Sequence, residues 1–314
     1  MSKRSSAPGA AAGLVASTWP LATGELGARG REVAFVLLAG LAVVWSWQPL
    51  TTVIARSLSA SEEYQHYSHI IVMPFITAYL LWLDRRTLVG RAKPGLRAAI
   101  LPLAIGALTV WLAGTSLVTA HPEYRLSLAM VGLVVMWTSA FVLCYGARAL
   151  WTALVPFLLL LFMIPLPPAA LHGVIHFLQK GSADASEVLF MVIGMPAFRN
   201  DFTFVLPGLA IRVAEECSGI RSSLALVISG LVMAYLFLRS RWTRLVFVAV
   251  IVPLAILKNA VRIVALSWMA IHWDPSFITG STVHRTGGIP VFLTSLMLLG
   301  GLAWLLRRFE PRSS

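Results

Sequence analysis

The sequence predicts an all-α polytopic membrane protein of about eight transmembrane helices, with an outer interfacial helix and a short β-hairpin before Cys217. Two observations predict this class. Of the 314 residues, 58% are hydrophobic and only 12% are charged, whereas soluble domains carry about 25% charged residues. Apolar runs approaching or exceeding 18 residues also recur, which is the length that a helix needs to cross a bilayer core of about 30 Å. A transmembrane barrel would show short alternating segments instead.

Eight apolar segments account for about half of the chain. They lie at about 33–54, 69–83, 98–118, 126–145, 149–164, 222–238, 245–271 and 289–306. Together they define one transmembrane domain, residues 31–308. We expect residues 1–30, which are polar and rich in Gly and Ala, to be a disordered cytoplasmic tail without a cleavable signal peptide, and residues 309–314 to be a second cytoplasmic tail.

The stretch between the fifth and sixth apolar segments is more polar than the rest. Residues 169–193 fit an amphipathic helix at the membrane surface, with a re-entrant hairpin as the alternative. Residues 202–206 and 209–213 read as two short strands around a Pro207-Gly208 turn. This hairpin leads the chain directly to Cys217.

The positive charges predict the orientation. The chain has 25 Lys and Arg residues and a net charge of +12, but these residues stand in short clusters between apolar runs. This distribution is typical of membrane orientation signals rather than of a nucleic-acid surface. If the N-terminus is cytoplasmic and residues 165–221 are outside, 16 of the 25 fall in cytoplasmic segments and 7 fall outside. Both termini are then cytoplasmic, in a multi-pass protein of the cytoplasmic (inner) membrane.

In this topology, three polar points meet at the outer face. Cys217 precedes the sixth apolar segment, and His284 and Gly288 adjoin the start of the eighth. Arg262 lies about 17 residues into the seventh segment, roughly 26 Å across a 30 Å core. Asn259 is three residues earlier, on the same helix face. The residues around the cysteine that we single out are Glu216, Ser218, Gly219 and Arg221.

These residue types permit catalysis by a thiol. A thiolate attacks carbonyls to give an acyl-enzyme, and nearby Arg, protonated His or a helix N-terminus lowers its pKa. Cys217 is the candidate nucleophile, Arg262 could stabilise an oxyanion or hold substrate, and His284 could act as acid or base. Alternatively, Arg262 snorkels to the headgroups and His284 is an ordinary loop residue. No paired Cys or His pattern appears, so we expect no metal or cofactor.

The run Glu216-Cys217-Ser218-Gly219-Ile220-Arg221 resembles the exosortase/archaeosortase family. The resemblance extends to Asn259 and Arg262, and to His284 with Gly288 four residues later. It also includes Tyr67-Ser68-His69, although Ile70 stands where the family pattern has glycine. It covers about residues 33–306.

This resemblance implies a sortase-like cysteine protease or transpeptidase on the outer (periplasmic) membrane face. Its substrates would be exported proteins with a C-terminal sorting signal: a motif often Pro-Glu-Pro, one transmembrane helix and a basic cluster. Cys217 would be the nucleophile, Arg262 the transition-state or substrate-binding group, and His284 the acid or base. The expected partners are these substrates, membrane lipid and an acceptor for transpeptidation, but no nucleic acid.

Two other functions compete with this interpretation. The first is a glutamate-type intramembrane protease related to the CAAX proteases, which use a Glu-Glu pair followed by Arg, although four residues separate Glu216 from Arg221. The second is a transporter or lipid-binding protein in which Asn259 and Arg262 line a pathway. The absence of repeated broken helices disfavours the second function.

Overall fold

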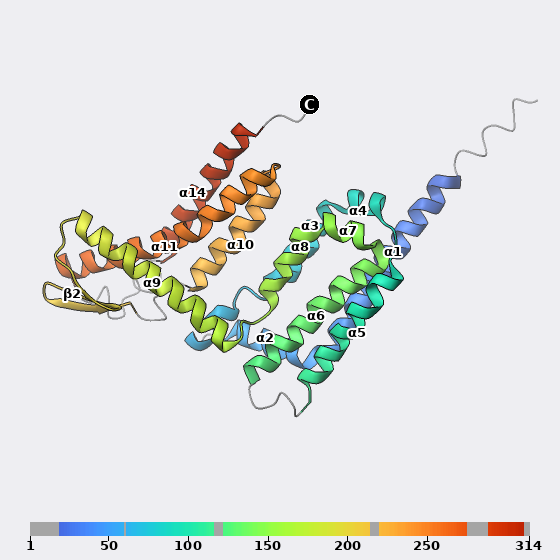
Figure 1. Cartoon of the computed structure of the whole chain (residues 1–314), viewed down its shortest axis with the longest axis horizontal. Coiled ribbons are helices and arrows are strands. Elements are labelled where there is room, and N and C mark those ends of the chain that lie inside the picture. Colours follow the sequence, from blue (N-terminus) through green and yellow to red (C-terminus); the bar gives the residue numbers. More distant parts are fainter. Residues whose placement is uncertain (1–18, 60, 116–121, 214–219, 275–287, 311–314) are drawn as a thin grey trace, which may run out of the picture. The chain divides into compact units, whose positions relative to one another are not determined.

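The computed structural model describes residues 19–59, 61–115, 122–213, 220–274 and 288–310. The chain divides into two compact units (Figure 1). The first unit comprises residues 1–51 and 74–161, and the second comprises residues 52–73 and 162–314.

The regular elements that the structure describes in the first unit are all helices. Its elements are α1 (Trp19–Trp45), α2 (Trp47–Leu58, which continues into the second unit), α3 (Val72–Leu83, which begins in the second unit), α4 (Arg85–Arg91), α5 (Leu96–Ala113), α6 (Pro122–Tyr145), α7 (Ala147–Thr152), α8 (Leu154–Leu159) and η3 (Leu160–Met163, which ends in the second unit). Helix α6 is buried along most of its length, because α5 and α1 both pack against it. The indole N–H of Trp137 on α6 donates to the Ala39 carbonyl oxygen of α1 at 3.1 Å.

Glycines allow α5 and α6 to approach closely. A Cβ atom at Gly132 would lie 2.5 Å from Thr109 Oγ1 and 2.7 Å from the Gly106 carbonyl oxygen. Small residues at such contacts let transmembrane helices pack backbone to backbone. We therefore expect Gly132→Ala to lower the free energy of unfolding by about 1–3 kcal/mol through overpacking.

The matched control for this prediction is Gly40→Ala on α1, where an added Cβ would meet no atom within 4 Å. That change is expected to be neutral or to stabilise the helix by up to about 1 kcal/mol. Unfolding by SDS titration measures both variants. Equal stability of the two would contradict the packing account.

Among its described residues, the second unit holds four long helices and a small sheet. Its remaining elements are η1 (Glu62–Tyr67), α9 (Pro168–Val192), β1 (Phe198–Asn200), β2 (Thr203–Leu206), β3 (Leu209–Arg212), α10 (Ile220–Phe237), α11 (Arg241–His272) and α14 (Gly288–Phe309). Helices α10, α11 and α14 pack side by side (Figure 1). Leu226, Phe247 and Leu299, one from each helix, belong to their shared core.

Glu310, the first residue after α14, binds the segment at the start of α11. Glu310 accepts hydrogen bonds from the backbone N–H groups of Arg239 and Ser240 and from the Thr243 hydroxyl. Desolvation works against ionisation here, but these hydrogen bonds and nearby Arg239 lower the pKa of the Glu310 carboxyl. The carboxylate therefore binds the two residues that precede α11 and one hydroxyl of its first turn.

The sheet has three strands, whereas the sequence predicted only the two of the hairpin. Strand order is β1-β2-β3, both pairs are antiparallel, and the Pro207-Gly208 turn joins β2 to β3 as expected. The three-residue strand β1 was missed because it is short and polar. Its Arg199 forms ion pairs of 2.8 Å with Asp184 and Glu187 on α9. Despite partial desolvation, the hydrogen bonds to these carboxylates raise the pKa of Arg199.

Each of the eight predicted spans contains helix among its described residues, but the first and the fifth are broken. Among the described residues, five helices are long and apolar enough to cross a membrane: α5, α6, α10, α11 and α14. The first predicted span is instead a pair, α1 and α2, bent by 81°. The second pair joins residues 154–163, which include α8 and η3, to α9, and it is bent by 100°. Each pair is therefore a broken span or a re-entrant segment. Helix α3 is apolar but has only 12 residues.

Proline explains why the first and fifth predicted spans are not continuous. Pro49 has no N–H to donate to the Trp45 carbonyl, and α1 ends at Trp45. Pro156 likewise cannot donate to the carbonyl of Thr152, where α7 ends. A proline inside a helix removes this hydrogen bond and crowds the preceding turn.

Two further predictions concerned an amphipathic helix over residues 169–193 and a disordered tail over residues 1–30. Helix α9 covers the predicted amphipathic helix of residues 169–193 and packs along α11; its location at the membrane surface stays a prediction. Helix α1 begins at Trp19, inside the range 1–30 that we expected to be disordered, and residues 1–18 lie outside the described residues.

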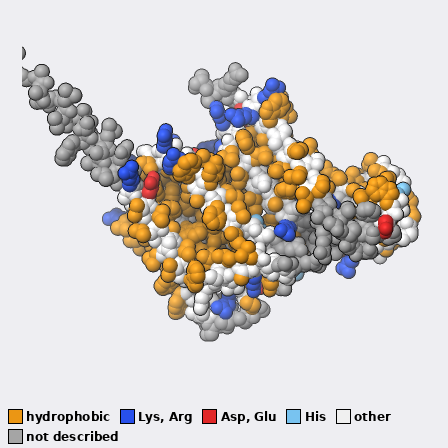
Figure 2. Space-filling view, turned by 180° about the vertical axis from the view of Figure 1, so that it is seen from behind, with side chains coloured by type: hydrophobic (Ala, Val, Ile, Leu, Met, Phe, Trp, Pro, Cys, Tyr) orange, Lys and Arg blue, Asp and Glu red, His pale blue; other side chains and the backbone are white. Residues whose placement is uncertain are grey.

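Apolar side chains are widely exposed, as a lipid-facing protein requires. Figure 2 shows them crowding the visible face. On α1 the exposed fractions reach 69% at Val44, and on α14 they reach 76% at Met297. Contiguous apolar surface of this kind marks an interaction face, and the length and composition of the helices identify the bilayer as the partner.

Candidate functional site

The candidate site belongs to the second unit, at the ends of α10, α11 and α14. Residues 214–219 and 275–287 lie outside the described residues, and with them Cys217, His284, Glu216, Ser218 and Gly219. The structure describes Arg221, Asn259, Arg262 and Gly288, together with the chain on either side of the cysteine segment.

The chain is firmly held just before the cysteine segment. The backbone N–H of Val213 donates to the Phe202 carbonyl oxygen at 2.8 Å. The buried amide Nε2 of Gln179 on α9 donates to the Val213 carbonyl oxygen. Val213 packs in one core with Phe204 and with Val264 of α11. The strand that leads to Cys217 is therefore anchored to both α9 and α11.

Two consecutive polar residues of α11 connect it to the neighbouring helices. Asn259, which is 2% exposed, donates from Nδ2 to Ser182 Oγ on α9 at 3.0 Å. Lys258, which is 5% exposed, donates from Nζ to Ser222 Oγ in the first turn of α10. Buried polar groups need such partners, and polar side chains commonly hold transmembrane helices together. Lys258 thus connects α11 to α10, which follows the cysteine segment, and Asn259 connects α11 to α9.

We expect the contact between Asn259 and Ser182 to stabilise the fold measurably. Asn259→Ala and Ser182→Ala each leave a buried polar atom without its partner. In a double-mutant cycle, the two changes should show a coupling of about 0.6–1.7 kcal/mol in the free energy of unfolding.

Thr294→Ala provides the control for this cycle. Thr294 is exposed on α14, and its hydroxyl donates to the Pro290 carbonyl oxygen of the same helix at 3.0 Å. Its replacement should change stability by less than about 0.5 kcal/mol. Strictly additive effects of the Asn259 and Ser182 changes would show that the hydrogen bond does not hold α9 to α11.

Arg262 lies beside the start of α14. It is half-buried, one helical turn after Lys258 and three residues after Asn259. A Cβ atom built on Gly288 would come within 3.9 Å of Arg262 Nε. This is an ordinary van der Waals distance, so the first turn of α14 lies beside the guanidinium. Because Gly288 follows His284 by four residues, Arg262 stands next to the described end of the histidine segment.

The structure brings some predicted residues together and separates others. Arg262 and Gly288 are neighbours, and Asn259 points instead to α9. Arg221 is exposed on the first turn of α10. The meeting of Cys217 and His284 with Arg262 stays a prediction.

Sequence reasoning missed Lys258, Ser222, Gln179 and Ser182 as parts of this site. Lys258 was visible as a charge inside an apolar segment, which is a signal for function. The α9 residues were less visible, although Gln179, Ser182 and Ser186 share a spacing of three and four residues that places them on one helix face. All three are buried.

An earlier segment also packs near the start of the sixth apolar segment. The turn η1 packs against α10. Tyr67, which is 1% exposed, accepts at its hydroxyl from Arg56 Nη1 at 3.2 Å, and its carbonyl accepts from Ser57 Oγ at 2.9 Å. The Tyr67-Ser68-His69 segment is thus part of the same unit as Arg262. Among the described residues, no group of three or more His, Cys, Asp or Glu side chains could hold a metal ion.

Comparison with known proteins identifies the family of the chain. The model of the transmembrane exosortase family matches residues 61–301. No curated protein and no solved structure matched the chain. The matched range includes η1, α9, the sheet, α10, α11 and most of α14. The chain therefore belongs to the transmembrane exosortase family, whose members are membrane proteases or transpeptidases that act on the sorting signals of exported proteins.

Proposed function

We propose that this protein is a cysteine-dependent exosortase that cleaves C-terminal sorting signals at the outer face of the cytoplasmic membrane. The signal would consist of a Pro-Glu-Pro-type motif, one transmembrane helix and a basic cluster. The observation that carries the proposal is the position of Arg262. It lies beside Gly288 and in the helix that anchors both flanks of the cysteine segment.

The proposed reaction uses the three residues in turn. Cys217 attacks the carbonyl carbon at the signal, and a tetrahedral oxyanion forms. Arg262 stabilises the negative charge that develops on this oxygen. His284 protonates the leaving amine, so that the C–N bond breaks and the substrate remains as a thioester on Cys217. An amine, a hydroxyl group or water then attacks the thioester and restores the thiol.

A reporter series tests the substrate class. Each reporter carries an exported domain, the motif, a transmembrane helix and a basic cluster, and is co-expressed with the wild-type protein. We expect tail release from the complete signal and none from a reporter whose motif is scrambled but whose helix and charges are unchanged. Equal release from both reporters would contradict recognition of the motif.

The contact between Lys258 and Ser222 favours a second mechanism. A serine hydroxyl beside a buried lysine amine is an arrangement that serine–lysine hydrolases use for nucleophilic attack. Ser222→Ala distinguishes the two mechanisms. If Cys217 is the nucleophile, Ser222→Ala should retain tail release within about tenfold of wild type, because it removes only a positioning contact. Complete loss in Ser222→Ala, with activity retained in Cys217→Ala, would establish the serine mechanism.

A further inference from the structure

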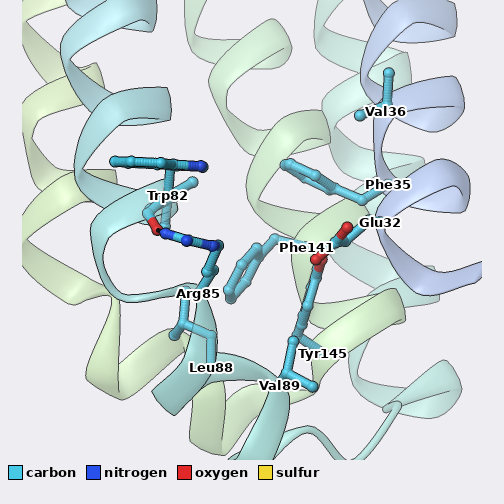
Figure 3. A pocket seen from close by; sticks show the side chains of 10 residues that line it. Glu32, Phe35, Val36, Trp82, Arg85, Leu88, Val89, Phe141 and Tyr145 are labelled. Atoms are coloured by element: carbon cyan, nitrogen blue, oxygen red, sulfur yellow. Dashed lines mark hydrogen bonds between the residues drawn. The ribbon is translucent and has the colours of Figure 1, made fainter. Parts of the chain in front are cut away.

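A cavity of about 340 Å³ opens in the first unit, whereas the candidate catalytic site is built in the second (Figure 3). Its walls come from α1, from the junction of α3 and α4, and from α6. Four of its residues are aromatic and two are charged. The lining residues are Glu32, Phe35, Val36, Leu81, Trp82, Arg85, Leu88, Val89, Phe141 and Tyr145.

Opposite charges occupy opposite walls of this cavity. The Arg85 guanidinium lies 4.3 Å from the centre of the Trp82 ring and donates from Nη1 to the Trp82 carbonyl at 2.7 Å. These contacts fix the direction of the guanidinium. Figure 3 shows Glu32 close to the Tyr145 hydroxyl on the other wall, with Phe141 between the two sides.

The cavity lies at the boundary between polar and apolar parts of two helices. On α1, Arg31 and Glu32 come directly before the long apolar stretch, and on α3 the apolar stretch ends directly before Asp84 and Arg85. These two boundaries meet at the cavity. Tryptophan and arginine at such a boundary are typical of the headgroup level of a membrane.

Exposed apolar side chains continue from the cavity along both helices. On α1, Val36 is 66% exposed and Leu37 is 68% exposed; on α3, Tyr79 is 55% exposed and Phe75 is 71% exposed. A ligand with a polar head in the cavity could therefore extend hydrocarbon chains along these helices. Burial of methylene groups on such a surface is favourable.

We propose that this cavity binds the headgroup of a zwitterionic glycerophospholipid that carries a primary amine. The phosphate would bind Arg85, and the ammonium group would bind Glu32 and the neighbouring aromatic faces. An anionic headgroup without an amine leaves Glu32 uncompensated beside its own negative charge. A trimethylated headgroup has no N–H to donate to the carboxylate. The primary amine is thus the headgroup that uses both walls.

Lipid retention by the full-length chain tests this proposal independently of cleavage. The protein is incubated in detergent with equal amounts of phosphatidylethanolamine, phosphatidylglycerol and phosphatidylcholine of identical acyl chains. Native mass spectrometry then measures the lipid that stays bound. We expect wild type to retain phosphatidylethanolamine about fivefold or more over each competitor, because it alone makes both charge-assisted contacts.

Three variants assign the contacts. Glu32→Gln should remove the preference over phosphatidylglycerol. Arg85→Gln should lower retention of phosphatidylethanolamine about fivefold or more. Arg86→Gln, which removes the same charge at an exposed neighbour outside the cavity, should retain lipid as wild type does.

Two results would overturn the proposal. One is equal or greater retention of phosphatidylglycerol by wild type, which would indicate general attraction of anionic lipid to the basic loop. The other is an identical lipid profile for Arg85→Gln and Arg86→Gln, which would show that the cavity does not contribute. Glu32→Gln keeps the proposal testable if Arg85→Gln fails to fold, because an unchanged lipid preference in that variant contradicts it.

Discussion

Replacement of Cys217 by alanine is expected to abolish release of the substrate tail and to lower the rate by at least about 1,000-fold. The thiol is the only group in the proposed reaction that forms a covalent bond with substrate, and alanine cannot do so. The measurement is the rate of tail release from the complete reporter, in membranes that contain equal amounts of each variant.

Cys144→Ala is the matched control for this prediction, because Cys144 and Cys217 are the two cysteines of the chain. Cys144 is buried in α6 of the first unit, so its loss should leave tail release near the wild-type rate.

Glu216→Gln tests the competing glutamate mechanism. Full activity in Cys217→Ala together with loss in Glu216→Gln would establish that mechanism. Full activity in both of these variants would leave neither Cys217 nor Glu216 a role in cleavage.

Replacement of Arg262 by glutamine is expected to lower kcat for tail release about 100- to 1,000-fold. This range is typical for removal of one group that stabilises an oxyanion. Arg262→Lys should recover little of the loss, because an ammonium group cannot reproduce the planar, forked geometry of a guanidinium. A single-turnover assay with the reporter separates the chemical step from substrate binding.

Two measurements separate a catalytic role of Arg262 from a structural one. Arg212→Gln removes the same charge from an exposed position on β3 and should retain near-wild-type activity. The free energy of unfolding of Arg262→Gln, measured by SDS titration, shows whether the helix packing survives. A stable Arg262→Gln protein with unchanged kcat would support the interpretation that this arginine only reaches for the headgroups.

The sequence predicted the helical segments well because their apolar runs are long. Periodicity and length identified α5, α6, α10, α11 and α14 within a few residues. The Pro207-Gly208 turn was predictable for the same local reason, since a glycine at φ +76° satisfies the turn. The breaks after Trp45 and Thr152 were missed, although each precedes a proline by four residues and is explained by the lost hydrogen bond.

The partners of polar residues could not be predicted, because they depend on contacts between distant segments. The bonds from Asn259 to Ser182 and from Lys258 to Ser222 span 77 and 36 positions. Sequence spacing placed Asn259 and Arg262 on one helix face, but it could not show that Asn259 packs against α9 while Arg262 lies beside Gly288. The predicted topology placed Arg262 and the start of the eighth apolar segment at the same membrane face. Arg262 does lie beside Gly288, the first residue of α14.

The central claim, that Cys217 forms a thioester with the substrate, is tested most directly by isolating that intermediate. The Cys144→Ser protein is mixed with a reporter and quenched in acid, and the adduct is digested and mapped by mass spectrometry. We predict an adduct on the peptide that contains Cys217, absent in Cys217→Ala and released by neutral hydroxylamine. An adduct on Ser222, or reporter cleavage with no covalent adduct at any time point, would contradict the account.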